Sequence, residues 1–150
     1  MLILILLAAT LACGETTAGQ KVGESVSATS APLKAPVYRA GDVINIDDYT
    51  VTLNSARITG SKLVANFTVD NTSGSKEVDI SSWWGWTAKD TDGNKLKQTL
   101  CDNPGLDGKV LVGDKLRGDI CWDGVRQNAA IKLYYEANVF SAGAIVWAVN

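Results

Sequence analysis

The chain has 150 residues, of which 46% are hydrophobic and 20% charged, as expected for one globular domain with short extensions. Its net charge of -2 leaves no excess of basic side chains to neutralise phosphates, which argues against nucleic-acid binding. It has no histidine, so the commonest general base at neutral pH and the commonest metal ligand are both absent.

The chain begins with a short apolar run. Residues 2–9 are all apolar, and a Thr-Leu-Ala tripeptide leads from them into Cys13. The run is too short to span a bilayer, which takes roughly 20 residues. It resembles a lipoprotein signal peptide, although leucine is usual where the tripeptide has threonine, and no lysine or arginine precedes the run. We expect residues 1–12 to be removed on export and Cys13 to carry a lipid anchor in the membrane; a plain secretion signal is the alternative.

Residues 13–36 form a polar segment between Cys13 and the first predicted strand. They are rich in Ser, Thr, Ala and Gly, and they end in a stretch that contains Pro32 and Pro36. Large apolar side chains are too few to offset the entropy of ordering this segment. We expect a flexible stalk with a reach of roughly 25 Å, which would hold the following domain outside the cytoplasm and just clear of a lipid surface.

The remainder, residues 37–150, has the pattern of an all-β domain. Apolar and polar side chains alternate in several segments, and turn-forming residues separate them. We expect seven or eight strands arranged as an immunoglobulin-like sandwich of two antiparallel sheets. The clearest strand segments are 49–53, 63–70, 131–135 and 144–149, and the turns are 47–48, 60–61, 71–75, 90–94 and 113–114.

The three cysteines divide into one and two. If Cys13 is lipidated, Cys101 and Cys121 remain, and two cysteines outside the cytoplasm pair by default. Their disulfide would staple the loop at 104–105, or two neighbouring strands, near one end of the sandwich. It does not match the immunoglobulin core disulfide, which joins the two sheets across a longer stretch of sequence. A metal site or a catalytic thiol is the competing interpretation, and the absence of histidine argues against it.

Several segments together resemble a known family. They are Gly41-Asp42, residues 49–56, residues 63–71, the turn at 90–93, residues 113–118 and the closing Ile145-Val146-Trp147. In these segments the chain is similar to the telokin-like family of exported bacterial domains of unknown function. The resemblance implies an immunoglobulin-like sandwich, and it brings no catalytic residues to carry over.

Acidic residues offer two candidate sites, and neither supports a strong functional prediction. The sequence Asp90-Thr91-Asp92-Gly93-Asn94 begins like a calcium loop, but its glycine comes too early and Cys101 stands where such a loop needs glutamate. A tight turn explains it more simply. Asp47 and Asp48 are adjacent and would point to opposite faces of a strand, so they cannot flank one bond. We therefore expect no metal, no cofactor and no catalytic activity.

The cluster of Trp83, Trp84 and Trp86 is the candidate binding surface. If residues 82–88 form a strand, Trp84 and Trp86 share one face and Trp83 lies on the other, so at least one of the three packs between the sheets. All three could be structural. An exposed tryptophan would instead serve a protein interface or stack on a sugar ring. We expect a non-catalytic surface module that binds or scaffolds an envelope protein, with carbohydrate or envelope-polymer binding as the alternative.

Overall fold

The computed structural model describes residues 20–21, 36–126, 128–137 and 143–149. The predicted signal peptide, the lipidation site Cys13 and nearly all of the predicted stalk lie outside these residues. Within the stalk, Gln20–Lys21 forms a short strand, β1, that pairs antiparallel with β3.

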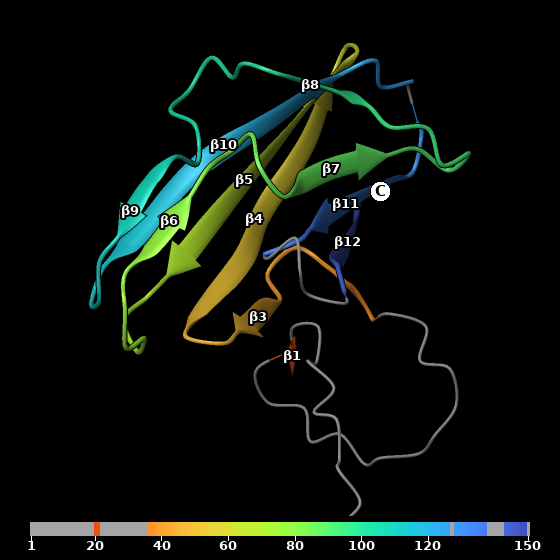
Figure 1. Cartoon of the computed structure of the whole chain (residues 1–150). Helices are drawn as coiled ribbons and strands as arrows, with labels where there is room; N and C mark the ends of the chain where they lie inside the picture. Colours follow the sequence, from red (N-terminus) through yellow and green to blue (C-terminus); the bar gives the residue numbers. More distant parts are fainter. Residues whose placement is uncertain (1–19, 22–35, 127, 138–142, 150) are drawn as a thin grey trace, which may run out of the picture.

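The larger sheet has six strands, and every neighbouring pair in it is antiparallel (Figure 1). A β-bulge interrupts the pairing of β4 with β5 between Leu53 and Ser55. In spatial order the strands are β1, β3 (Val43–Ile46), β4 (Tyr49–Thr59), β5 (Lys62–Asp70), β10 (Lys115–Asp123) and β8 (Lys97–Thr99).

The second sheet has four strands, and a third, small sheet has two. The strand order of the second sheet is β2 (Val37–Tyr38), β12 (Ile145–Val149), β11 (Ile131–Tyr135) and β7 (Trp86–Lys89). The small sheet pairs β6 (Val78–Ile80) with β9 (Gly108–Val110). Strands β2 and β12 run parallel, which departs from the predicted antiparallel pairing. The described residues hold twelve strands rather than seven or eight, because several strands have only two to four residues.

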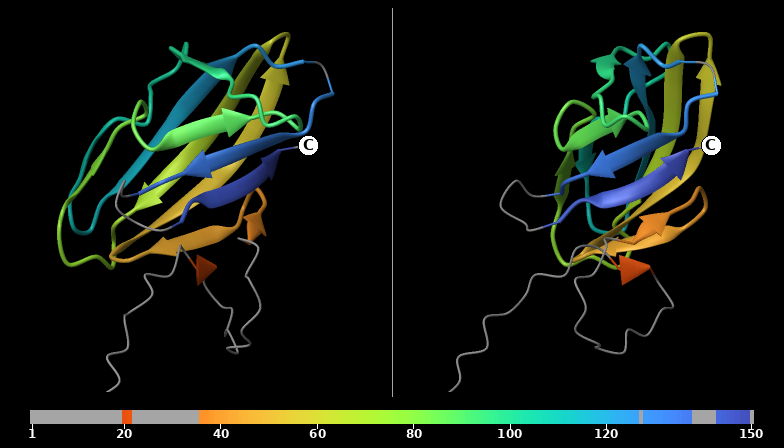
Figure 2. Two further views of the ribbon diagram at one scale, coloured as in Figure 1. Left: turned by 45° about the vertical axis from the view of Figure 1, so that its right-hand side comes forward. Right: turned by 90° about the vertical axis from the view of Figure 1, so that its right-hand side faces the viewer.

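The two large sheets pack face to face, as the two views in Figure 2 show. Along β5 the side chains alternate strictly, with every second residue fully buried. One of these is Phe67, whose ring centre lies 4.6 Å from that of Trp86 on β7 and 5.5 Å from that of Trp147 on β12. These contacts cross from one sheet to the other, so the predicted all-β, immunoglobulin-like sandwich is confirmed.

A tyrosine pair also joins the sheets. The hydroxyls of Tyr49 on β4 and Tyr135 on β11 lie 3.0 Å apart in a buried hydrogen bond. Burial raises the pKa of both phenols, because a phenolate would lose its hydration there. The pair satisfies two polar groups inside an otherwise apolar interface.

The Asp90–Asn94 segment is the predicted tight turn. The Asp90 carboxylate accepts hydrogen bonds from the backbone N–H groups of Asp92 and Asn94 at 3.0 and 2.8 Å. Gly93 takes a φ of +84°, which glycine adopts without strain. The carboxylate is thus engaged by its own loop, as an aspartate at a turn commonly is.

After this turn the chain changes sheets. Leu96 N–H donates to the Ala88 carbonyl at 2.9 Å, so the returning segment first runs beside β7. It then continues as β8 at the end of the six-stranded sheet. Strand β7 is likewise the end strand of its own sheet, so the two sheet edges meet on one side of the sandwich (Figure 1). The candidate site lies on this side.

Candidate functional site

The tryptophan cluster lies on a turn and not along a strand. Strand β7 begins only at Trp86, and Gly85 before it has a φ of +80°. A β-carbon at Gly85 would meet the Glu136 carbonyl oxygen at 2.5 Å, so this close approach requires glycine. The prediction that Trp84 and Trp86 share one face is therefore wrong, because the reversal at Gly85 breaks the alternation.

Trp86 belongs to the core. It is 5% exposed, and its ring stacks on Tyr135 with centres 4.0 Å apart. Its indole N–H donates to the Ser81 carbonyl at 3.1 Å. The prediction that at least one tryptophan of the cluster packs between the sheets is correct, and Trp86 is not part of any outer surface.

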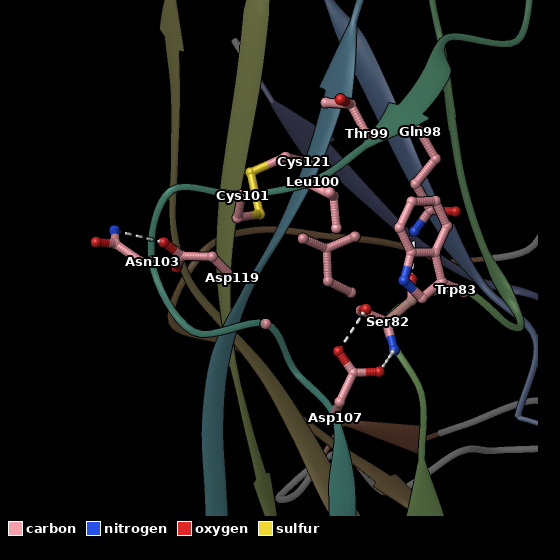
Figure 3. Close-up of a pocket in the computed structure, with 12 residues that line it drawn as sticks. Ser82, Trp83, Gln98, Thr99, Leu100, Cys101, Asn103, Asp107, Asp119 and Cys121 are labelled. Atoms are coloured by element: carbon pink, nitrogen blue, oxygen red, sulfur yellow. Dashed lines mark hydrogen bonds between the residues drawn. A yellow bond between two sulfur atoms is a disulfide. The ribbon is translucent and has the colours of Figure 1, made fainter.

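Trp83 and Trp84 are exposed. Their exposed fractions are 49% and 79%, and Leu100, just after β8, is 73% exposed. Trp83 and Leu100 line the same cleft (Figure 3). We call Trp83, Trp84 and Leu100 together the Trp83 surface. Exposed tryptophan side chains of this kind are candidates for a binding surface.

Hydrogen bonds of Ser82 hold the turn that carries Trp83 and Trp84. The Ser82 backbone N–H and hydroxyl donate to the two oxygens of Asp107 at 2.8 and 2.7 Å. The Ser82 carbonyl accepts a hydrogen bond from the Gln98 side chain. On the other side, the Gly85 carbonyl accepts from Glu136 N–H at 2.8 Å. The exposed tryptophans thus sit on a fixed backbone, which lowers the entropy lost when a ligand binds.

A small cleft of about 100 Å³ lies between Trp83 and the segment that follows β8 (Figure 3). Its rim is partly apolar, with Trp83 and Leu100, and its polar lining includes Gln98, Asn103 and Asp107. Asp107 and Gln98 are already engaged with Ser82, so few of these polar groups are free to bind a ligand.

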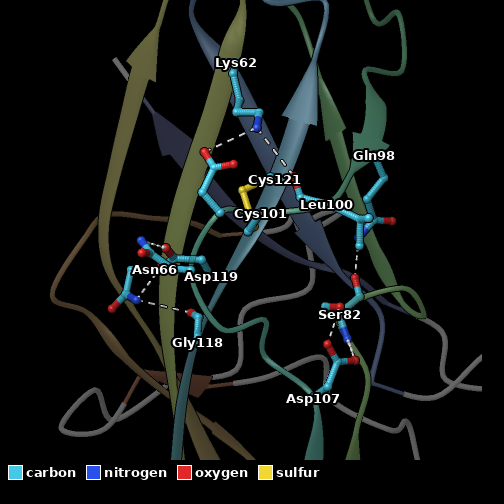
Figure 4. Close-up of a disulfide and its surroundings, with 12 residues drawn as sticks. Lys62, Asn66, Ser82, Gln98, Leu100, Cys101, Asp107, Gly118, Asp119 and Cys121 are labelled. Atoms are coloured by element: carbon cyan, nitrogen blue, oxygen red, sulfur yellow. Dashed lines mark hydrogen bonds and ion pairs between the residues drawn. A yellow bond between two sulfur atoms is a disulfide. The ribbon is translucent and has the colours of Figure 1, made fainter.

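The predicted disulfide between Cys101 and Cys121 is present, with an S–S distance of 2.14 Å. Cys101 follows β8 and Cys121 lies on β10, so the bond joins neighbouring parts of one sheet (Figure 4). Lys62 adds a hydrogen bond to the Leu100 carbonyl at 3.5 Å. The disulfide thereby fixes the segment beside Leu100, which confirms its predicted place near neighbouring strands.

Two parts of the site were not predicted from the sequence. Leu100 was not singled out, and the Ser82–Asp107 pair joins residues 25 positions apart. Neither carries a local signal, since the first depends on where β8 ends and the second on how the β6 and β9 segments pair.

The described residues show neither a membrane-spanning helix nor a metal centre. No helix in this part of the chain is long and apolar enough to cross a bilayer. The same residues contain no group of three or more Cys, Asp or Glu side chains placed to hold a metal ion.

Two solved structures share this fold. The YjhA protein of Bacillus subtilis matches 76% of this chain and 100% of its own, with a TM-score of 0.62 and 14% identity. YcdA of Bacillus subtilis, described as a putative lipoprotein, matches 69% of this chain and 37% of its own, with a TM-score of 0.56 and 14% identity. Neither a protein-family model nor a curated protein sequence matches the chain, so the telokin-like family stays a prediction.

Proposed function

We propose that this protein is a non-catalytic, lipid-anchored module outside the cytoplasm that binds another protein of the cell envelope through the Trp83 surface. The anchor would be the lipid on Cys13, and the stalk would give the domain its reach. A structural neighbour described as a putative lipoprotein agrees with this placement.

The observation that carries the proposal is the exposure of two tryptophans on a rigid turn. Burying Trp84 at an interface would remove a large apolar surface from water, at roughly 25 cal/mol for each Å². Because Ser82 already fixes the turn, little conformational entropy would be lost on binding. Tryptophan is also the residue most enriched among interface hot spots.

The experiment is chemical cross-linking on intact source cells, followed by mass spectrometry of the linked peptides. We expect one envelope protein to be enriched over an unrelated surface lipoprotein, with links from Lys62, whose Nζ lies 3.5 Å from the Leu100 carbonyl oxygen, and from Lys97 on β8. A partner linked only through distant lysines, or no enriched protein, would contradict the proposal.

Carbohydrate binding is the second candidate, and the cleft beside Trp83 favours it. An indole face next to amide side chains is a common way to hold a sugar ring, and Gln98 and Asn103 line this cleft. Against it, Gln98 is already bonded to Ser82, and about 100 Å³ is small for a whole sugar. A glycan screen with the full chain decides between the two candidates: binding that is lost in Trp83→Ala would favour the sugar.

A further inference from the structure

The outer face of the six-stranded sheet carries a second, polar groove of about 370 Å³. It borders the loop 102–107 and shares Asn103 and Asp119 with the cleft beside Trp83. Its volume is within the range of about 300–1,000 Å³ that small-molecule sites occupy. Its lining comes from β4, β5, β10 and that loop, and the polar side chains in it are Ser55, Arg57, Asn66, Asn103, Arg117 and Asp119.

The β-bulge in β4 creates this groove. Tyr49, Val51 and Leu53 face the core, so strict alternation would send Ser55 and Arg57 inward as well. The register shift between Leu53 and Ser55 reverses the alternation and places both polar side chains outside. The positively charged guanidinium group of Arg57 therefore lies on the outer, polar face of the sheet.

Asp119 forms the floor of the groove and is 5% exposed. Asn66 Nδ2 donates to one of its oxygens at 2.6 Å, and Asn103 Nδ2 donates to the other at 2.9 Å (Figure 4 shows Asn66 and Asp119). Among the described residues Asp119 has no ion pair, so amides alone hold a buried carboxylate. Such a group is costly to bury, and the remaining lone pairs of its oxygens are available to hydroxyl donors.

Asn66 is itself fixed from three sides. Its Oδ1 accepts from Asn54 Nδ2 at 2.9 Å and from Arg117 Nε at 2.8 Å, while its Nδ2 also donates to the Gly118 carbonyl at 3.3 Å. The floor is therefore preorganised, and Arg117 is held over it by its Nε. Its terminal nitrogens have no partner among the described residues.

The rim of the groove supplies unused donors. Within the described part of the chain, Arg57 has neither a hydrogen bond nor an ion pair, and the Ser55 hydroxyl has no partner. Arg57 and Arg117 both line the groove and are exposed, so two guanidinium groups can reach one bound anion. Guanidinium pairs with a carboxylate through two parallel hydrogen bonds.

From this arrangement we propose that the groove binds a sugar acid: a hydroxylated ring that carries one carboxylate. The carboxylate lies against Arg57 and Arg117, and ring hydroxyls donate to the spare lone pairs of Asp119. A neutral sugar leaves the arginines without an acceptor, and a simple anion leaves the hydroxyl positions empty. The site does not use Trp83, Trp84 or Leu100, so it stands independently of the protein-binding function proposed for the Trp83 surface. It shares Asn103 with the cleft beside Trp83.

The test is titration of the isotope-labelled full chain with galacturonate, galactose and acetate, followed by NMR. We expect saturable shifts of the Ser55, Asn66 and Asn103 signals with galacturonate, and weaker binding of both other probes. Arg57→Gln should weaken galacturonate binding about tenfold or more, since hydrogen bonds to charged groups are the strong ones. Because Arg57 is exposed and makes no hydrogen bond or ion pair within the described residues, this variant should fold normally.

Arg126→Gln is the matched control, because Arg126 pairs with Asp92 at 3.6 Å, away from the groove. It removes the same charge and should leave the affinity unchanged. A trimer of galacturonate separates two sources of the ligand: tighter binding of the trimer assigns the groove to an acidic polysaccharide, and equal binding assigns it to a single sugar acid. No saturable binding, equal affinity for galactose, or equal losses in Arg57→Gln and Arg126→Gln would overturn the proposal.

Discussion

Trp84 and Trp86 are two residues apart and lie in opposite environments. Trp86 is 5% exposed and stacks on Tyr135 inside the sandwich, whereas Trp84 is 79% exposed on the turn before β7. Gly85 between them reverses the chain. The same residue type thus serves the core in one region and forms a displayed surface in the other.

The core around Trp86 stabilises the fold, whereas the turn that carries Trp83 and Trp84 is available for binding. The core region depends on packing between sheets, through Phe67, Trp86 and Trp147. The turn depends instead on hydrogen bonds around Ser82, which need neither Trp83 nor Trp84. We therefore expect stability and binding to respond to different substitutions.

The largest contrast is between Trp86→Ala and Trp84→Ala. Trp86→Ala should lower the free energy of unfolding by about 3–5 kcal/mol, because it leaves a cavity between the sheets. Trp84→Ala should change it by about 0.5 kcal/mol or less, as exposed substitutions do. Urea denaturation of both variants measures the free energy of unfolding. Comparable decreases in the two variants would contradict the assignment of Trp86 to the core and Trp84 to the surface.

The disulfide comes next. It closes a loop with a sequence separation of 20, so its reduction should cost roughly 3 kcal/mol in the chain-entropy model. Denaturation with and without dithiothreitol measures this effect. The double variant Cys101→Ser/Cys121→Ser is the control, and its stability should not respond to the reductant. If the stability of the wild-type protein also did not change with reductant, the disulfide would contribute nothing to the free energy of unfolding.

Tyr49→Phe should change the alkaline limb of stability. The pKa of both buried tyrosines is raised in the folded protein, whereas the unfolded chain releases phenol protons near pH 10. The contribution of this tyrosine pair to the free energy of unfolding is therefore fully present below about pH 10 and is lost as the pH rises above it. At neutral pH the variant should be about 1 kcal/mol less stable than wild type, because the hydrogen bond is gone. When the pH rises above 10, the stability of the variant should fall less than that of wild type. Parallel stability curves above pH 10 would contradict this assignment.

Asp70→Asn should have the smallest effect, and that effect should disappear in acid. The hydrogen bond to Lys115, with Nζ and Oδ2 2.7 Å apart, and that to Thr72 lower the pKa of Asp70 to about 2. Its stabilisation is present above about pH 4 and is lost as the pH falls towards 2. Because the pair is partly solvated, we expect a loss of about 1 kcal/mol or less at pH 7 and none at pH 2. A difference between wild type and variant that persists at pH 2 would point to a cause other than this charge.

Much of the fold could be predicted because its signals are local. Alternation in residues 63–70 and 131–135 shows which side chains are buried without any knowledge of the partner strand. The turn at Asp90 is likewise encoded by adjacent residues. The pairing of Cys101 with Cys121 followed from having only one candidate pair left.

The sites could not be predicted because they depend on register and on single backbone reversals. The predicted shared face of Trp84 and Trp86 fails at Gly85, where the chain reverses. The outward position of Arg57 was not predicted, because the bulge after Leu53 reverses the alternation there. The groove also joins Arg57 to Arg117, sixty positions along the chain. Such contacts arise only once the strands are paired.

The most direct test of the protein-binding account compares two double variants in intact source cells. Trp83→Ser/Trp84→Ser removes two residues of the Trp83 surface; Leu111→Ser/Val112→Ser removes two side chains that are 50% and 52% exposed between β9 and β10. Both should fold with unchanged stability. The account predicts that the cross-linked envelope partner disappears only in the first variant. Retention of the partner in that variant, or equal loss in both, would contradict it.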